Sequence, residues 1–84
     1  MTDPHLEAAH RHCTNNHNEL ALSKIAGCFH CQRWFPASEI RRWRGLTAMC
    51  PYCGIDSVIG DKAGYPPIAG FLRKMHEYWF TPRD

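Results

Sequence analysis

The chain has 84 residues and a net charge of +2, and 44% of its residues are hydrophobic and 12% aromatic, which excludes a disordered chain. No apolar run approaches the ~20 residues that span a bilayer, so a protein built on membrane-spanning helices is also excluded. A hydrophobic core of this size is marginally stable alone, so a metal ion is a useful additional cross-link.

A first helix is predicted near the start of the sequence. Asp3 has the side chain of an N-cap, and Pro4 suits the first helical position. A helix that runs from here to about Arg11 places Leu6 and Ala9 on one side, where they can face a core.

A second helix is predicted after the polar segment Thr14-Asn15-Asn16. Asn16 and Glu19 have the spacing of a capping box, which predicts a helix over His17–Ala26. Gly27 follows at the position where a helix often ends in a left-handed residue. The apolar face of this helix is narrow, so we expect it to be held by packing against the rest of the domain.

Two Cys-x-x-Cys pairs are the strongest motif in the sequence. Cys28 and Cys31 form the first pair, and Cys50 and Cys53 form the second after an interval of 18 residues. This spacing is typical of four thiolates that bind one tetrahedral Zn²⁺, with a turn at each pair and Gly54 at a positive φ. We therefore predict one structural zinc ion.

Two other interpretations compete with zinc. The four cysteines could form two disulfides, or one pair could be a thioredoxin-like redox motif. The redox motif lies within a longer alternating strand and helix pattern, which this sequence lacks. His30, inside the first pair, is a less suitable ligand than the four cysteines. A closed site of four cysteines leaves no coordination position for water, so metal-assisted hydrolysis is not expected.

A β-hairpin is predicted between the two cysteine pairs, over residues 32–49. Its strands are Arg33–Phe35 and Glu39–Trp43, and Arg44-Gly45 forms the turn before Leu46–Met49 returns to the second pair. A short helical turn over Ala37–Trp43 is the alternative, because Pro36 and the residues after it also resemble the start of a helix.

A third strand and a last helix are predicted after the second cysteine pair. Ile55–Ile59 is short and β-branched, and residues 60–67 are rich in glycine and proline, as in a loop. Ile68–Phe80 follows as an amphipathic helix that ends at Thr81-Pro82. Its predicted apolar stripe consists of Ile68, Leu72, Met75 and Trp79.

Excess positive charge lies between the cysteine pairs. Residues 28–53 contain four arginines and one glutamate and sum to +3. Guanidinium groups neutralise phosphates and flat rings stack on unpaired bases, so this composition indicates a nucleic-acid surface. Its candidate residues are Arg33, Trp34, Arg41, Arg42, Trp43 and Arg44. The alternative is that the rings cover the core while the arginines are solvated.

Other side chains are candidates for binding or catalysis. The last helix has more large apolar residues than one stripe needs, so Phe71, Tyr78 or Phe80 is a candidate contact for a protein partner or a second copy. His10, Cys13 and His17 have helical spacing, which suggests a second metal site or a nucleophile, against the alternative of polar residues near a terminus.

The segment from Gly27 to Gly60, with the later Met75-His76-x-x-Trp79-Phe80, resembles a group of small uncharacterised bacterial proteins usually labelled only "cytoplasmic protein". Its most specific part is the zinc-ribbon-like Cys-Pro-Tyr-Cys-Gly-Ile-Asp-Ser-Val-Ile. The resemblance implies a cytosolic location and a metal site made of Cys28, Cys31, Cys50 and Cys53. It implies no catalytic residues.

These elements predict one small α+β domain over residues 1–84. It consists of N-terminal helices in 1–27, a zinc ribbon with a three-stranded sheet in 28–60, and a helix over 68–80. A treble clef is the alternative fold, and it requires a helix that begins at Cys50 or Cys53. Gly54 and the β-branched residues after it oppose such a helix.

The predicted function is a non-catalytic, zinc-stabilised binding module that acts as a protein-interaction adaptor or regulator. A nucleic-acid-binding zinc protein is the alternative, and a small enzyme using Asp56 or His76 is a more distant one. The first residues lack the basic and apolar segments of a secretory signal, and four cysteines are spaced for a metal, so we expect a cytoplasmic protein that has no contact with membranes.

Overall fold

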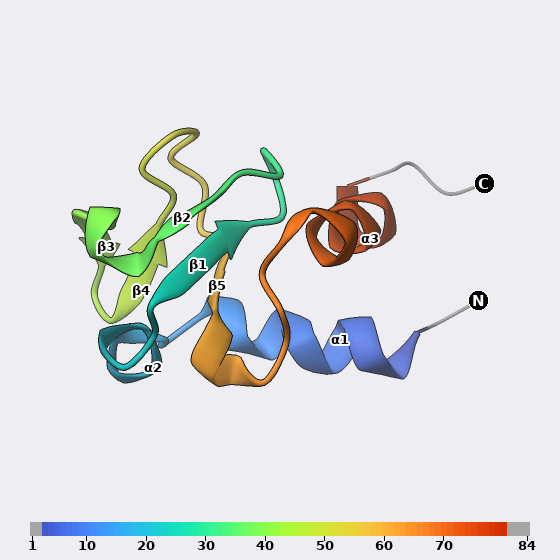
Figure 1. Ribbon diagram of the computed structural model, residues 1–84, viewed down its shortest axis with the longest axis horizontal. Helices are drawn as coiled ribbons and strands as arrows, with labels where there is room; N and C mark the ends of the chain where they lie inside the picture. The colour runs from blue at the N-terminus through green and yellow to red at the C-terminus, as the bar shows by residue number, and fades with distance from the viewer. Residues whose placement is uncertain (1–2, 81–84) are drawn as a thin grey trace.

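The computed structural model describes residues 3–80, and strand β1 (Ile25–Cys28) lies at the centre of its three-stranded antiparallel sheet. On its two sides β1 pairs with β2 (Trp34–Pro36) and with β5 (Val58–Gly60), so the sheet order is β2-β1-β5. A separate two-stranded hairpin consists of β3 (Arg42–Arg44) and β4 (Thr47–Met49). Helices at the two ends of the chain complete the predicted α+β fold (Figure 1).

The predicted second helix is wrong beyond Ala21. Helix α2 covers only His17–Ala21, and the chain then turns into β1, which is the central strand. Two neighbouring strands form hydrogen bonds with the backbone N–H and C=O groups of β1, and this long-range pairing outweighs the local helical pattern. Gly27 therefore lies within a strand, where a Cβ would be 2.6 Å from the carbonyl oxygen of Pro67.

The predicted hairpin over residues 32–49 is only partly right. Its first strand, β2, pairs with β1 across the first cysteine pair. Between β2 and β3 the chain forms a 3₁₀ turn, η2 (Ala37–Glu39), close to the helical alternative. The true hairpin joins β3 to β4 through Gly45 and Leu46, and Gly45 adopts a φ of +60°. The third strand predicted after the second cysteine pair is present as β5, but it pairs with β1.

Both terminal helices form as the sequence predicts. Asp3 caps α1 (Pro4–His10) by accepting hydrogen bonds from the N–H groups of His5 and Leu6, and a 3₁₀ turn, η1 (Arg11–Cys13), extends the helix. Helix α3 (Ala69–Phe80) packs against α1 at one end of the molecule (Figure 1). Its predicted end at Thr81-Pro82 lies outside the described residues.

The apolar face of α3 differs in phase from the predicted stripe. Leu72 and Met75 are buried as predicted, but Ile68 and Trp79 remain partly exposed. Phe71 takes a place in the core instead. Within the described part of the chain, neither α3 nor any other helix is both long and apolar enough to cross a bilayer.

Two hydrophobic clusters cover opposite faces of the sheet. Val58 and Ile59 are consecutive in β5 and therefore point to opposite faces. Val58 joins the cluster that contains Phe35 and the cysteine sulfurs, while Ile59 joins the cluster formed with α1 and α3. The sheet is thus buried on both sides, which explains why all three residues of β5 are buried.

A buried amide holds three segments of the fold together. The side chain of Asn16 donates hydrogen bonds to the carbonyl oxygens of His12, at 3.0 Å, and Val58, at 2.8 Å. Its carbonyl oxygen accepts the N–H of Ala48 at 3.1 Å. Asn16 therefore connects η1, β5 and β4. The sequence predicts that its side chain caps α2, and this prediction is wrong.

We expect Asn16→Ala to lower the free energy of unfolding by roughly 2–4 kcal/mol, because it leaves buried backbone groups without partners. Asn18→Ala is the matched control, since Asn18 lies exposed on α2, and it should change stability by less than about 0.5 kcal/mol. Urea unfolding followed by circular dichroism measures both values. Equal midpoints for the two variants would contradict this role of Asn16.

Candidate metal centre

Four cysteine sulfurs converge between the sheet and the hairpin. The Sγ atoms of Cys28, Cys31, Cys50 and Cys53 all lie within 4.8 Å of one another. The Sγ atoms of Cys28 and Cys53 are 3.6 Å apart, and those of Cys31 and Cys50 are 3.7 Å apart. A tetrahedral Zn²⁺ with bonds of about 2.3 Å to sulfur separates its ligands by about 3.8 Å. The sulfurs therefore fit one tetrahedral metal ion.

The two cysteine loops have the same backbone geometry. The N–H of Cys28 donates to the carbonyl of Arg33, and the N–H of Gln32 donates to the carbonyl of Cys28. In the second loop, the N–H of Cys50 donates to the carbonyl of Ile55, and the N–H of Gly54 donates to the carbonyl of Cys50. We call these loops the first and second knuckle, residues 28–33 and 50–55.

Each knuckle contains one residue in the left-handed region at the same position. It is Gln32, with φ of +64°, in the first knuckle and Gly54, with φ of +78°, in the second. The predicted conformation of Gly54 is confirmed. Gln32 has the same conformation without the freedom of glycine, so the first knuckle contains backbone strain that the second avoids.

The sulfurs are in different electrostatic environments. Burial raises the pKa of Cys28 and of Cys53. Burial also opposes ionisation of Cys50, but the N–H groups of Cys53 and Tyr52 point at its sulfur and bring its pKa below the ordinary value. A nearby cation would favour the thiolate form of all four sulfurs.

The chemistry of this cluster is that of a closed site. All five cysteines are free, so the disulfide interpretation does not describe this structure. Four sulfurs fill a tetrahedral coordination sphere and leave no position for water. In the stretch 3–80 these four cysteines are the one group of three or more Cys, His, Asp or Glu side chains arranged to hold a metal ion.

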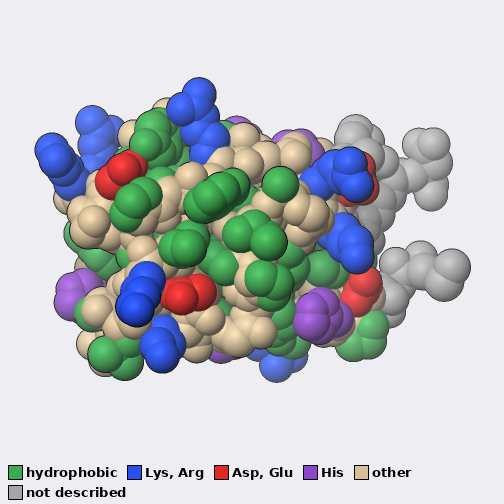
Figure 2. Space-filling model, in the orientation of Figure 1, with side chains coloured by type: hydrophobic (Ala, Val, Ile, Leu, Met, Phe, Trp, Pro, Cys, Tyr) green, Lys and Arg blue, Asp and Glu red, His purple; other side chains and the backbone are tan. Residues whose placement is uncertain are grey.

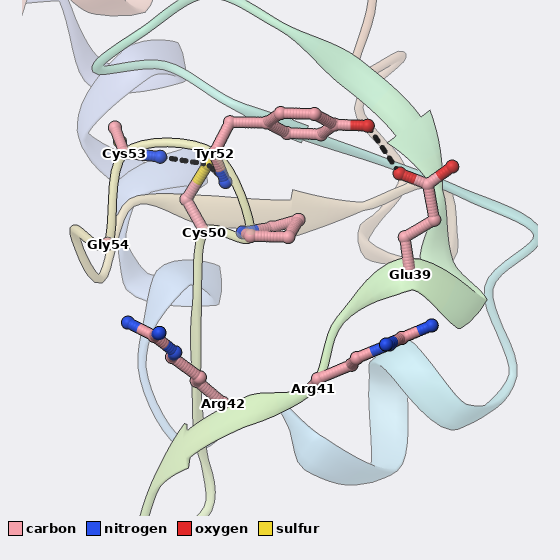
Figure 3. Close-up of a pocket in the computed structure, with 8 residues that line it drawn as sticks. Glu39, Arg41, Arg42, Cys50, Tyr52, Cys53 and Gly54 are labelled. Atoms are coloured by element: carbon pink, nitrogen blue, oxygen red, sulfur yellow. Dashed lines mark hydrogen bonds between the residues drawn. The ribbon is translucent and has the colours of Figure 1, made fainter.

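A pocket of about 450 Å³ lies next to the second knuckle. Figure 3 shows Tyr52 and Glu39 on one side of it and Arg41 and Arg42 on the other. The hydroxyl of Tyr52 donates a hydrogen bond of 2.5 Å to Glu39, which raises the pKa of Tyr52. Arg33 lies over the ring of Tyr52 at 4.9 Å from its centroid.

The candidate nucleic-acid residues divide into two groups. The first group lines two hollows to which Tyr52 also contributes. Arg41 and Arg42 line one of them, and Arg33 and Trp34 line the other. Trp43 instead packs against the ring of His17, with centroids 4.8 Å apart, and Arg44 lies at the end of β3. The predicted surface is therefore centred on the second knuckle, and the β3–β4 hairpin contributes only part of it.

Two of the three candidate partner residues are occupied within the fold. Phe71 is buried, so its prediction as an exposed partner contact is wrong. The hydroxyl of Tyr78 donates to Glu7 and accepts the N–H of Asp3, which joins α3 to the start of α1. Phe80 is 41% exposed and contacts the rings of Phe29, His30 and His76.

The structure separates the predicted cluster of His10, Cys13 and His17. His10 packs against Trp79 and His17 against Trp43, so the two imidazoles belong to different parts of the molecule. Cys13 is buried, and burial together with the charge of Asp56 raises its pKa to about 11. This thiol is protonated at neutral pH and is a poor nucleophile.

The two residues predicted for an enzyme lie on different segments of the fold. Asp56 is exposed in the segment that precedes β5. One ring nitrogen of His76 lies 3.1 Å from the carbonyl oxygen of Phe29, so it holds α3 against the first knuckle.

Sequence reasoning missed two residues of the site. In the sequence, Tyr52 is only an inner residue of a cysteine pair. Its position at the tip of the turn is the signal that its side chain is exposed. Gln32 was missed because nothing in its side chain signals a left-handed backbone. Its position, four residues after Cys28 as Gly54 is four after Cys50, is the available signal.

Comparisons with models of protein families, with curated proteins and with solved structures give no match. The resemblance to small bacterial proteins therefore stays a prediction. The function of this chain is inferred from its own geometry.

We expect substitutions at the two left-handed positions to have opposite effects. Gly54→Ala should lower the free energy of unfolding by about 1–2 kcal/mol, because nothing lies within 4 Å of the added Cβ and only backbone strain is introduced. Gln32→Gly should raise it by roughly 0.5–1 kcal/mol, and Gln32→Ala should leave it nearly unchanged. Denaturant unfolding in the presence of zinc tests this, and two changes of the same sign would contradict it.

Proposed function

We propose that this chain is a zinc-stabilised binding module that catalyses no reaction of its own. The convergence of four cysteine sulfurs within 4.8 Å carries this proposal. Zinc suits the site because sulfur ligands in a tetrahedron are its usual structural coordination. Such thiolates persist in a reducing compartment, which supports a cytoplasmic location.

The position of the sulfur cluster supports a structural role for the metal. The first knuckle joins β1 to β2, and the second joins β4 to β5. One ion bound by both knuckles would cross-link the sheet and the hairpin across a long interval of sequence. Metal binding and folding are coupled in small domains of this kind.

Two observations favour binding over catalysis. A site with four protein sulfurs gives a substrate no access to the metal. The exposed side chains instead form a surface beside the second knuckle, where arginines and aromatic rings lie together. Because Phe71 is buried and Tyr78 is bonded to α1, this surface is better supported as the binding face than α3.

We expect the purified chain to contain one zinc ion and to lose helix and sheet content together when a chelator removes it. Cys50→Ser should abolish stoichiometric zinc and lower the unfolding temperature strongly, because three sulfurs leave the sphere incomplete. Cys13→Ala is the control, since Cys13 lies outside the cluster, and it should retain full zinc.

Elemental analysis and circular dichroism measure these outcomes. A Cys50→Ser protein with unchanged zinc content, or a metal-free chain with an unchanged spectrum and unfolding temperature, would refute the proposal.

A further inference from the structure

The exposed ring of Tyr52 separates two basic hollows. Arg41 and Arg42 line the hollow of about 450 Å³ beside the second knuckle. Arg33 and Trp34 line a second hollow of about 390 Å³, and Tyr52 contributes to both. We call the six residues Arg33, Trp34, Glu39, Arg41, Arg42 and Tyr52 the Tyr52 surface. Figure 2 shows Lys and Arg side chains projecting beside hydrophobic ones at the end of the molecule that carries β3 and β4.

We propose that the Tyr52 surface binds single-stranded nucleic acid. Arg41 and Arg42 would each contact a phosphate on one side of Tyr52, and Arg33 would contact a third phosphate on the other side. Trp34 would stack on a base between them. This inference rests on the proposed zinc module, because Tyr52 lies between two of the metal ligands, Cys50 and Cys53.

The aromatic part of the surface is both exposed and oriented. Trp34 is 54% exposed, so one of its faces is available to a base. Tyr52 is fixed by its hydrogen bond to Glu39 and lies 5.5 Å from the ring of Phe35. Arg33 lies over the Tyr52 ring. Nucleobases stack on tryptophan rings and on guanidinium planes, and such an arrangement costs little reorganisation on binding.

The charges of the surface favour a polyanion. Three positive charges come from Arg33, Arg41 and Arg42, and one negative charge comes from Glu39. The carboxylate of Glu39 accepts the hydrogen bond from the Tyr52 hydroxyl. Protein interfaces also contain arginines and aromatic rings, but here the arginines leave a net positive charge beside exposed rings, which is the arrangement that follows a phosphate backbone. A duplex hides the faces of its bases, so stacking on Trp34 selects unpaired strands.

A competing role for these arginines arises from the metal centre. Four thiolates and one Zn²⁺ sum to −2, and Arg41 and Arg42 line the same hollow as Cys50 and Cys53. The arginines would then stabilise the metal site electrostatically. This role predicts zinc loss in arginine variants, whereas nucleic-acid binding predicts loss of affinity with zinc retained.

Fluorescence anisotropy with the zinc-loaded full chain and a labelled oligothymidylate of about 12 nucleotides tests the proposal. Arg41→Ala combined with Arg42→Ala should weaken binding at least tenfold, and Trp34→Ala should weaken it about 5- to 100-fold. The matched controls are Arg73→Ala with Lys74→Ala, which remove the same charge from the exposed face of α3, and Trp79→Ala. These controls should bind within about twofold of the parent protein.

The salt dependence gives a second measurement. Three phosphate contacts on a single strand predict that log K falls with log salt concentration with a slope of about −2. The double arginine variant should have a slope smaller in magnitude by about 1.4. A matching duplex should bind more weakly than the single strand at every salt concentration.

Zinc content, measured on every variant, separates this proposal from the one it rests on. A zinc-loaded, folded chain that binds no oligonucleotide would refute the nucleic-acid proposal and leave the zinc module intact. Unchanged affinity in the double arginine variant together with lost zinc would also refute it and establish the electrostatic role. Nuclease-insensitive capture of a protein that the double variant abolishes would assign the surface to a protein partner.

Discussion

Four cysteine sulfurs brought to one point from two loops are the constraint on which the rest of this structure depends. Between residues 3 and 80, no strand of the sheet pairs with a strand of the β3–β4 hairpin, so the knuckles, a shared hydrophobic cluster and Asn16 join the two. Four ionised sulfurs at 3.6–3.7 Å would repel one another, so a bound cation would stabilise their thiolate form. The proposed zinc ion and the tertiary fold are therefore parts of one equilibrium.

The metal centre alone does not position the N-terminal segment. Asn16 supplies that connection through three buried hydrogen bonds, which link η1 to strands on both sides of the second knuckle. Close packing adds a second constraint where α2 meets the sheet, because a Cβ on Gly60 would be 2.3 Å from the Ser23 hydroxyl oxygen. A small domain thus combines a metal cross-link with a few contacts of high specificity.

Features encoded by neighbouring residues could be predicted from the sequence. The Cys-x-x-Cys pairs, the cap of α1 and the extent of α3 depend on residues within a few positions of one another. Strand β1 could not be predicted, because its local helical pattern is outweighed by pairing with residues 7 to 34 positions away. The prediction of the site was incomplete for a similar reason, since Tyr52 contacts Arg33 and Glu39 only in the folded chain.

The bond between Tyr78 and the backbone of Asp3 places the first and last described segments side by side, and Figure 1 shows the start of α1 and the end of α3 on the side away from β3 and β4. An affinity tag, a fluorophore or a neighbouring domain joined beyond these helix ends would be attached on the side of the molecule away from β3 and β4. This arrangement suits tethering to a solid support, because the immobilised molecule would keep its arginine-rich side directed toward the solution.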